Sequence, residues 1–220
     1  MVLEAYRARL GAYIDRLARP FLTWQPDRLS WMALGWAGAA ALVAAAVRWT
    51  TPLLFIAVTV LIFLSGLFDV LDGAVARRTG RASVRGDFLD HVLDRYADVL
   101  LVLGIAVSSF ANPVIALLAL VSLLLTSYMG TQAQAVGLGR VYRGLLTRAD
   151  RLVVLMAATF FEFDFSIPWP WAKSLPWQTF HVGGIAFTVL DVAFVYFIVA
   201  GQWTAVDRAV RVYRALPKSP

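Results

Sequence analysis

The sequence predicts an all-α integral membrane protein with six transmembrane helices, preceded by an N-terminal amphipathic helix in the membrane interface. Hydrophobic residues make up 60% of the 220 residues and charged residues only 15%, with a mean hydropathy of +0.70. Soluble domains usually carry about 25% charged residues. Several apolar stretches also approach or exceed the roughly 20 residues that cross a hydrocarbon core of about 30 Å. The remaining residues are too few for a separate soluble domain.

Residues 1–20 predict the interfacial helix. Apolar residues recur there at three- and four-residue intervals against a polar face, as in helices that lie in the membrane interface. These apolar residues are Val2, Leu3, Tyr6, Leu10, Tyr13, Ile14 and Leu17. The segment also carries six charged residues, too many for a cleavable signal peptide. Pro20 and Pro26 are expected to end the helix.

Six apolar spans are expected after this helix. Their ranges are 29–47, 52–75, 87–110, 113–137, 150–167 and 179–203. Lys and Arg alternate between the connections: 17 lie in the N-terminal segment, the even-numbered loops and the C-terminal tail, and two lie in the odd-numbered loops. Positive residues concentrate on the cytoplasmic side of membranes. We therefore expect a multi-pass protein of the cell membrane with both termini in the cytoplasm.

This layout divides the chain into the interfacial helix 1–20, a membrane domain 27–205 and a basic cytoplasmic tail 206–220. The net charge of +6 is spread between the spans, so we expect no nucleic-acid partner. The absence of cysteine excludes disulfides, thiolate metal sites and cysteine nucleophiles. The small residues of the first span, GWAGAAALVAAA, predict close helix packing rather than a ligand site.

Six of the 14 acidic residues lie between Asp69 and Asp98. At 100° per residue, Asp69 and Asp72 lie about 60° apart on the second span. The four acids of the third span fall within an arc of roughly 80°; they are Asp87, Asp90, Asp94 and Asp98. Ionised side chains at membrane depth are costly and by default mark function. Each of the two spans therefore presents an acidic stripe near the cytoplasmic side.

Bound divalent cations are expected beside these stripes, because Arg77 and Arg95 alone cannot balance six carboxylates. Aspartate oxygens favour Mg²⁺, Mn²⁺ or Ca²⁺ over Zn²⁺. Mg²⁺ commonly combines carboxylates with phosphate oxygens, which implies a phosphate-bearing substrate. Gly73, Ala76 and Gly86 leave room for a nucleotide diphosphate to approach the backbone. Arg77 offers a guanidinium fork for a phosphate oxygen.

The residues of the two stripes resemble the signature of the CDP-alcohol phosphatidyltransferases, membrane enzymes of phospholipid biosynthesis. The pattern reads Asp69-x2-Asp72-Gly73-x2-Ala76-Arg77-x8-Gly86-x3-Asp90-x3-Asp94. The resemblance extends to the six-span layout, the interfacial helix and the entry Pro26-Asp27-Arg28-Leu29-Ser30. It implies transfer of a phosphatidyl-type group from a CDP-linked lipid to an alcohol, with release of CMP and assistance from two divalent ions, Mg²⁺ or Mn²⁺.

The resemblance also implies roles for single residues. Asp69, Asp72 and Asp90 would be the main metal ligands, while Asp94 would border the second metal and deprotonate the acceptor. The implied contacts to CDP are Asp69, Gly73, Ala76, Arg77 and Gly86. A homodimer surrounded by membrane lipids is implied as well. Residues 127–137 resemble archaeal members, in which the lipid would be an archaeol derivative rather than a diacylglycerol.

The fourth loop supplies the candidate acceptor residues Arg140, Arg143, Arg148 and Arg151. Arginine clusters suit phosphate groups, so glycerol phosphate or inositol phosphate is the expected acceptor. The same arginines also satisfy the positive-inside rule. Serine or another small alcohol is therefore the alternative acceptor.

Four further polar residues have structural or secondary interpretations. His91 is expected either to pack against neighbouring side chains or to contact the acidic stripe without binding the metal itself. Asp87 and Asp98 are either solvated residues or supporting ones. Asp191 is expected in the middle of the sixth span, bonded to a neighbouring helix or reaching the polar cavity.

Three other functions remain in competition. A cation transporter also uses intramembrane carboxylates, but the third loop, 108–112, offers no acidic track to the outer side. A membrane prenyltransferase also binds a diphosphate through Mg²⁺, but its two aspartate-rich motifs lie far apart in sequence. An inactive family member would serve as a structural partner, yet all four signature aspartates are present.

Overall fold

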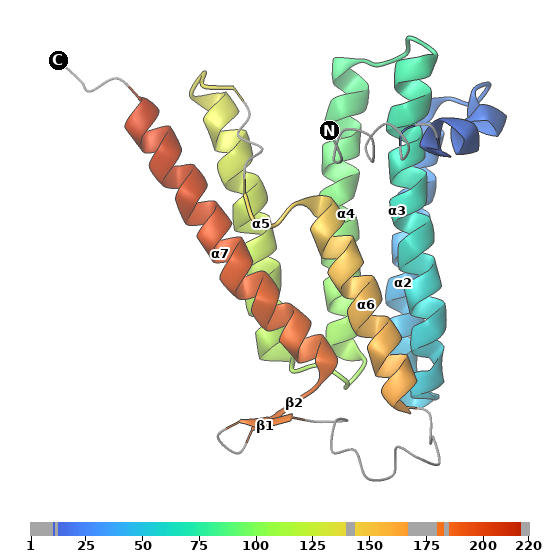
Figure 1. The fold of residues 1–220 in the computed structure, drawn as a ribbon, viewed down its shortest axis with the longest axis vertical. Coiled ribbons are helices and arrows are strands. Elements are labelled where there is room, and N and C mark those ends of the chain that lie inside the picture. Colours follow the sequence, from blue (N-terminus) through green and yellow to red (C-terminus); the bar gives the residue numbers. More distant parts are fainter. Residues whose placement is uncertain (1–10, 12, 140–143, 167–179, 183–184, 217–220) are drawn as a thin grey trace.

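The computed structural model describes residues 11, 13–139, 144–166, 180–182 and 185–216. Within these ranges the chain forms six long helices (Figure 1). They are α2 (Pro26–Ala46), α3 (Phe55–Arg78), α4 (Val84–Val107), α5 (Pro113–Ala135), α6 (Arg148–Ser166) and α7 (Val189–Ala215). The short elements are the 3-10 turns η1 (Arg19–Phe21), η2 (Val47–Trp49) and η3 (Pro52–Leu54), and the strands β1 (Phe180–Val182) and β2 (Ile185–Phe187).

Local sequence signals account for the starts of several helices. Pro26 and Pro113 stand in the first turns of α2 and α5, where the missing N–H would have no intrahelical partner. The Asn112 side chain accepts a hydrogen bond from the Val114 N–H at 2.9 Å. The Ser83 hydroxyl caps α4 in the same way. Such caps satisfy amide groups that the first turn leaves open.

The helices pack in two neighbouring groups. In the first, α2 packs against both α3 and α4, and in the second, α5 packs against α7. Helix α6 contacts α3 and α7, and α4 contacts α5, so the groups are joined (Figure 1). Figure 1 also shows that α6 begins partway along α4 rather than at the end of the bundle. The first turn of α6 therefore lies deep beside the polar part of α4.

Among the residues that the structure describes, four stretches are long and apolar enough to cross a membrane. They are Pro26–Trp49, Pro52–Arg78, Pro113–Ala135 and Val189–Ala215. Helices α4 and α6 have similar lengths but carry six and five residues of Asp, Glu, Lys or Arg. The protein is therefore a helical membrane protein. Helices α4 and α6 supply acidic and basic residues of the site, together with Asp69 and Asp72 of α3 and Arg208 of α7.

The expected sixth span, 179–203, is wrong at its start, and the expectation of an all-α chain misses a hairpin there. Strands β1 and β2 pair antiparallel before α7, with Phe180 opposite Phe187. Helix α7 begins only at Val189 and continues through residues 206–215, the first part of the expected tail. The described residues Phe180–Val182 and Ile185–Phe187 thus form strands, which hydrophobicity alone does not distinguish from part of a span.

Asp191 starts α7 instead of lying in its middle. Thr188 and Asp191 form a capping box, in which each side chain accepts a hydrogen bond from the other's backbone N–H. The second carboxylate oxygen of Asp191 accepts a hydrogen bond from the Asn112 N–H at 2.6 Å. Asp191 is therefore a structural residue that ties the start of α7 to the connection between α4 and α5.

The expected interfacial helix falls mostly outside the described residues, which omit 1–10 and 12. Its described part, residues 13–18, is helical. The Asp15 carboxylate forms an ion pair with Arg78 at 2.8 Å, and Ala18 is fully buried in a small cluster with Leu29 of α2 and Leu71 of α3. These contacts attach the segment to the end of the helices that carry the acidic stripes.

The small residues of α2 allow close packing against α4, as expected. Ala37, Ala40 and Ala44 are fully buried. A Cβ added to Gly104 of α4 would lie 2.5 Å from the backbone of Ala41. At such a distance the two helices must move apart to admit one methyl group.

We expect Gly104→Ala to destabilise the protein by about 1–3 kcal/mol, the usual cost of overpacking a well-packed interface. Gly38→Ala is the matched control, because an added Cβ at Gly38 of α2 would meet no atom within 4 Å. Alanine is about 1 kcal/mol better than glycine in a helix, so the control should be neutral or stabilising. Thermal unfolding in detergent measures both, and equal melting temperatures for the two variants would contradict the close approach.

Candidate active site

The two acidic stripes meet between α3 and α4. Asp69, Asp72 and Asp90 each offer a carboxylate oxygen, and these oxygens lie within 4.8 Å of one another. Asp72 is only 6% exposed, and one of its oxygens accepts a hydrogen bond from the Ser30 hydroxyl at 2.5 Å. The helical spacing on each span therefore produces one three-carboxylate group across two helices.

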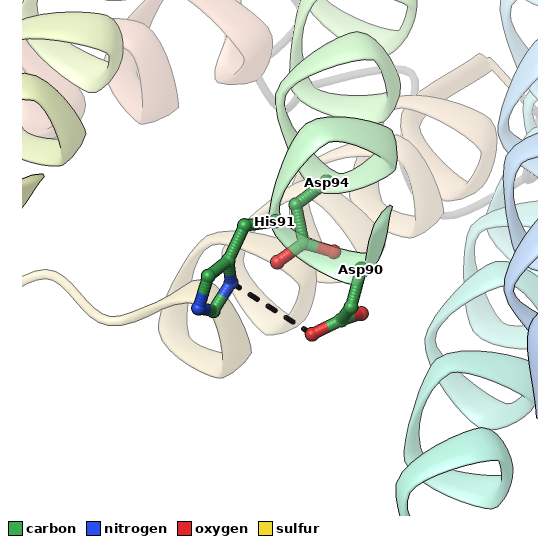
Figure 2. Close-up of side chains that lie close together, drawn as sticks. All are labelled: Asp90, His91 and Asp94. Atoms are coloured by element: carbon green, nitrogen blue, oxygen red, sulfur yellow. Dashed lines mark ion pairs between the residues drawn. The ribbon is translucent and has the colours of Figure 1, made fainter. Parts of the chain in front are cut away.

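A second ligand group lies one turn further along α4. Figure 2 shows Asp90, His91 and Asp94 projecting from the same side of this helix, with His91 Nδ1 3.8 Å from Asp90 Oδ2. One ligand atom from each of the three residues lies within 4.8 Å of the others. His91 Nε2 is also 3.3 Å from the Asp87 carboxylate. His91 is therefore a candidate ligand of the site, whereas only a packing or supporting role was expected.

The donor atoms of both groups fit divalent metal ions. The first group consists of carboxylate oxygens alone, which suit hard ions such as Mg²⁺ and Mn²⁺. Asp90 belongs to both groups, so a single carboxylate could bridge two ions. The four aspartates expected to bind metal are therefore brought together around Asp90.

The first cavity lies beside the three-carboxylate group and holds about 230 Å³. Its walls include Asp72, Gly73, Ala76, Arg77 and Gly86. A Cβ on Gly73 would lie 3.1 Å from the Arg77 guanidinium, so glycine keeps room beside this cation. Four of the five residues expected to contact CDP line this cavity, and the fifth, Asp69, lies in the adjoining carboxylate group.

The second cavity holds about 270 Å³ and is strongly basic. Four arginines line it, together with His91 and Asp94 from α4. The arginines are Arg95, Arg148, Arg151 and Arg208. Arg148 and Arg151 were expected here from the sequence, whereas Arg140 and Arg143 lie outside the described residues. An arginine-lined cavity of this size suits a small anion such as a phosphate ester.

Arg208 is one of the cavity residues that the sequence analysis did not assign to the site. It was counted in the basic tail, but α7 continues past it and leaves the side chain only 8% exposed. Its guanidinium donates a hydrogen bond to the Thr126 carbonyl at 2.6 Å. Residues Phe197, Gly201 and Thr204 are buried at the preceding turns, so Arg208 continues a buried stripe with the helical period. The helical period of these buried positions could have predicted that Arg208 is buried as well.

Arg148 connects the acidic group to the basic cavity. Its guanidinium lies between α3 and α4 and forms ion pairs with Asp69 and Asp94. The same nitrogen is 3.9 Å from Asp90. Because α6 begins deep in the bundle, its first residue reaches the acidic group, while Arg151 one turn later lines the basic cavity.

Long apolar helices surround an acidic centre with two polar cavities, an arrangement that suits a membrane enzyme acting on phosphate-bearing substrates. The chain belongs to the CDP-alcohol phosphatidyltransferase family, whose model matches residues 26–206. It is an enzyme of this class and a transferase of phospholipid biosynthesis. The family expected from the aspartate signature is therefore confirmed.

Two curated relatives are similar over much of their length. The archaetidylinositol phosphate synthase of Methanothermobacter thermautotrophicus is 32% identical over 152 residues, which cover 69% of this chain and 67% of that protein. The phosphatidylinositol phosphate synthase of Cutibacterium acnes is 32% identical, with 97% of this chain and 99% of that protein covered.

Solved structures of the phosphatidylinositol phosphate synthase of Mycobacterium tuberculosis have the same fold. The structure with CDP-DAG bound has a TM-score of 0.72 at 26% identity and covers 94% of this chain and 98% of that chain. The structure in complex with manganese and citrate also has a TM-score of 0.72 and 26% identity, with 94% and 93% covered.

Proposed function

We propose that this protein transfers a phosphatidyl-type group from a CDP-linked lipid to a hydroxyl group of inositol phosphate and releases CMP. The observation that carries the proposal is the arginine-lined cavity next to the acidic group. An unphosphorylated acceptor such as serine or inositol would not need four guanidinium groups. The names of the relatives support inositol phosphate over glycerol phosphate, the second candidate acceptor.

The relation of the two cavities supports a direct transfer between bound substrates. Asp90 lines the first cavity and Asp94 lines the second, one helical turn later on α4. A CDP group held by Gly73, Arg77 and Gly86 would place its diphosphate near Asp90. An acceptor held by the arginines would place its hydroxyl near Asp94. The reacting atoms would then meet at one turn of α4.

Asp69, Asp72 and Asp90 are proposed to hold two divalent ions, Mg²⁺ or Mn²⁺, with Asp94 at the border of the second. When bound, these ions would neutralise the diphosphate and stabilise the entering and leaving oxygens of an in-line displacement. The manganese complex of the Mycobacterium tuberculosis enzyme supports this assignment. Asp90 supports it as well, since its carboxylate is common to both ligand groups.

The transfer breaks the diphosphate bond of the CDP-linked lipid and forms a phosphate ester bond to the acceptor. The acceptor oxygen attacks the phosphorus that carries the lipid, a new P–O bond forms, and the P–O bond to CMP breaks. Asp94 takes the proton of the acceptor hydroxyl, since a carboxylate within hydrogen-bond reach of the nucleophile can act as general base. Arg77 and the arginines of the second cavity hold the two substrates in line.

The membrane arrangement remains part of the proposal. We propose that α2 to α7 all cross the membrane, with both termini and both cavities on the cytoplasmic side, as the distribution of Lys and Arg supports. The proposed domain organisation is the interfacial helix 1–20 and a membrane domain that begins at 27 and extends with α7 to Ala215 instead of ending at 205. The proposed assembly is a homodimer. CDP-linked diacylglycerol and CDP-linked archaeol remain alternative lipid donors.

An acceptor panel with one arginine variant tests the substrate assignment. Purified protein with Mg²⁺ and CDP-linked lipid should release CMP with inositol phosphate, and far less with glycerol phosphate, inositol or serine. Arg208→Gln should raise the KM for inositol phosphate about tenfold or more, because one charge-assisted contact is lost. Arg214→Gln, on the exposed end of α7, is the matched control. Equal use of inositol and inositol phosphate would refute a phosphorylated acceptor.

A further inference from the structure

Asp98 lies behind the basic cavity, one turn beyond Asp94 on α4. It is 5% exposed and does not line either cavity in the described part of the chain. One of its carboxylate oxygens, Oδ2, is 3.0 Å from Arg95 Nη1 and 3.1 Å from Arg151 Nη2. Two of the four arginines of the cavity therefore converge on a single buried oxygen from different helices.

Asp98 gives the buried Arg151 and the partly exposed Arg95 a shared anionic partner. Arg151 is only 4% exposed, and a buried guanidinium is costly without an anionic partner. Two guanidiniums side by side also repel each other, and a carboxylate between them offsets this repulsion. Arg151 Nε has no hydrogen-bond partner among the described residues, so this cation keeps a buried N–H for a further acceptor.

The contact also reaches the proposed base. Arg95 Nη2 is 3.8 Å from Asp94 Oδ2, so Arg95 lies between Asp98 and Asp94. A chain of alternating charges thus runs from Arg151 through Asp98, Arg95 and Asp94 to Arg148. Without Asp98, Arg95 and Arg151 would lose the anion that holds their guanidiniums at the cavity.

We propose that Asp98 is a positioning residue that orients Arg95 and Arg151 for the phosphate group of the acceptor. The proposal rests on the proposed function, because it assumes a phosphorylated acceptor in the basic cavity. Asp98 touches neither substrate in this account. Its effect reaches the acceptor through the two guanidiniums, which need fixed directions to bind phosphate oxygens in pairs.

Asp98→Asn and Asp98→Glu test the proposal. Asn keeps the size of the side chain but removes the charge, and Glu keeps the charge. For Asp98→Asn we expect the KM for inositol phosphate to rise about tenfold or more, the loss of one charge-assisted contact. The dissociation constant of the CDP-linked lipid should stay within about twofold, since that substrate occupies the other cavity. The KM of Asp98→Glu for inositol phosphate should lie between that of Asp98→Asn and that of the unchanged protein.

Direct binding separates positioning from a general structural role. Calorimetric titration with inositol phosphate should show weaker binding to Asp98→Asn, whereas titration with CDP-linked lipid should not. Asp15→Asn is the matched control, because Asp15 forms an exposed ion pair with Arg78 and neither residue lines the basic cavity. An unchanged KM and affinity for inositol phosphate in Asp98→Asn would overturn the proposal.

Two further outcomes are decisive. If Asp98→Asn fails to bind CDP-linked lipid, the charge-balanced double variant Asp98→Asn with Arg95→Gln is measured instead. A double variant that binds the lipid must lose more inositol phosphate affinity than Arg95→Gln alone, because Arg95 itself lines the basic cavity. Loss of lipid binding in both variants would assign Asp98 to folding and overturn the proposal. Failure of the proposed function is distinguished by the unchanged protein. It would then release CMP without a phosphorylated acceptor.

Discussion

Asp94→Asn is expected to lower the rate of CMP release by about 10²–10⁴-fold, the usual contribution of a general base. The side chain keeps its shape but can no longer take the acceptor proton. Asp94 lines the basic cavity and forms ion pairs with Arg95 and Arg148, so its carboxylate lies where the acceptor hydroxyl must approach. The rate is measured at saturating concentrations of both substrates.

Binding of the CDP-linked lipid should survive in Asp94→Asn, because the first cavity is lined by other residues. Asp15→Asn serves as the control for removal of a carboxylate, since its ion pair with Arg78 is exposed. Full activity of Asp94→Asn would refute the assigned base. Loss of lipid binding together with activity would place Asp94 among the residues required for the first cavity.

Asp90→Asn is expected to have the second large effect, on metal dependence. Asp90 is the one aspartate common to both ligand groups, so its loss should weaken both proposed ions. Loss of a metal-bound carboxylate should raise the Mn²⁺ concentration for half-maximal activity at least about tenfold. Chelation of divalent ions should stop CMP release by the unchanged protein.

Paramagnetic resonance of Mn²⁺ gives a reading that does not depend on turnover. We expect two bound ions in the unchanged protein and weaker binding of both in Asp90→Asn, with Asp15→Asn unchanged. Normal affinity for two ions in Asp90→Asn would contradict the proposal that Asp90 contributes to both metal sites. A single ion in the unchanged protein would contradict the proposed pair of metals.

The sequence predicted the acidic group well because its geometry is local. Asp69 and Asp72 share one helix and Asp90 and Asp94 another, so the helical period fixes which side chains share a face. Only the packing that brings α3 and α4 together did not follow from the helical period. The cavity beside Gly73 and Gly86 followed from the same two helices.

The basic cavity was harder to predict because its residues come from distant parts of the chain. Arg208 contacts Thr126 across 82 residues of sequence, and no local period brings α5 and α7 together. The range of α7 was also misjudged, since the residues before Val189 form a hairpin and the expected tail is helical. Arg208 was therefore assigned to a solvated tail instead of a buried face.

Asp98 and His91 illustrate a second limit. Both lie on α4 with the signature aspartates, and the helical period placed Asp98 on the acidic stripe. The helix that faces each aspartate decides whether it joins the proposed metal site or pairs with arginines. Asp90 faces α3, whereas Asp98 meets Arg151 of α6 at 3.1 Å. That difference depends on where α6 begins, which hydrophobicity does not reveal.

The most direct test measures products from the purified protein in liposomes that contain CDP-diacylglycerol or CDP-archaeol, with Mg²⁺ and inositol phosphate outside. We expect CMP and the corresponding inositol phosphate lipid in equal amounts, identified by mass spectrometry, and neither product when the metal or the acceptor is omitted. Metal-dependent cation flux without CMP release, or CMP release without the inositol phosphate lipid, would contradict this expectation.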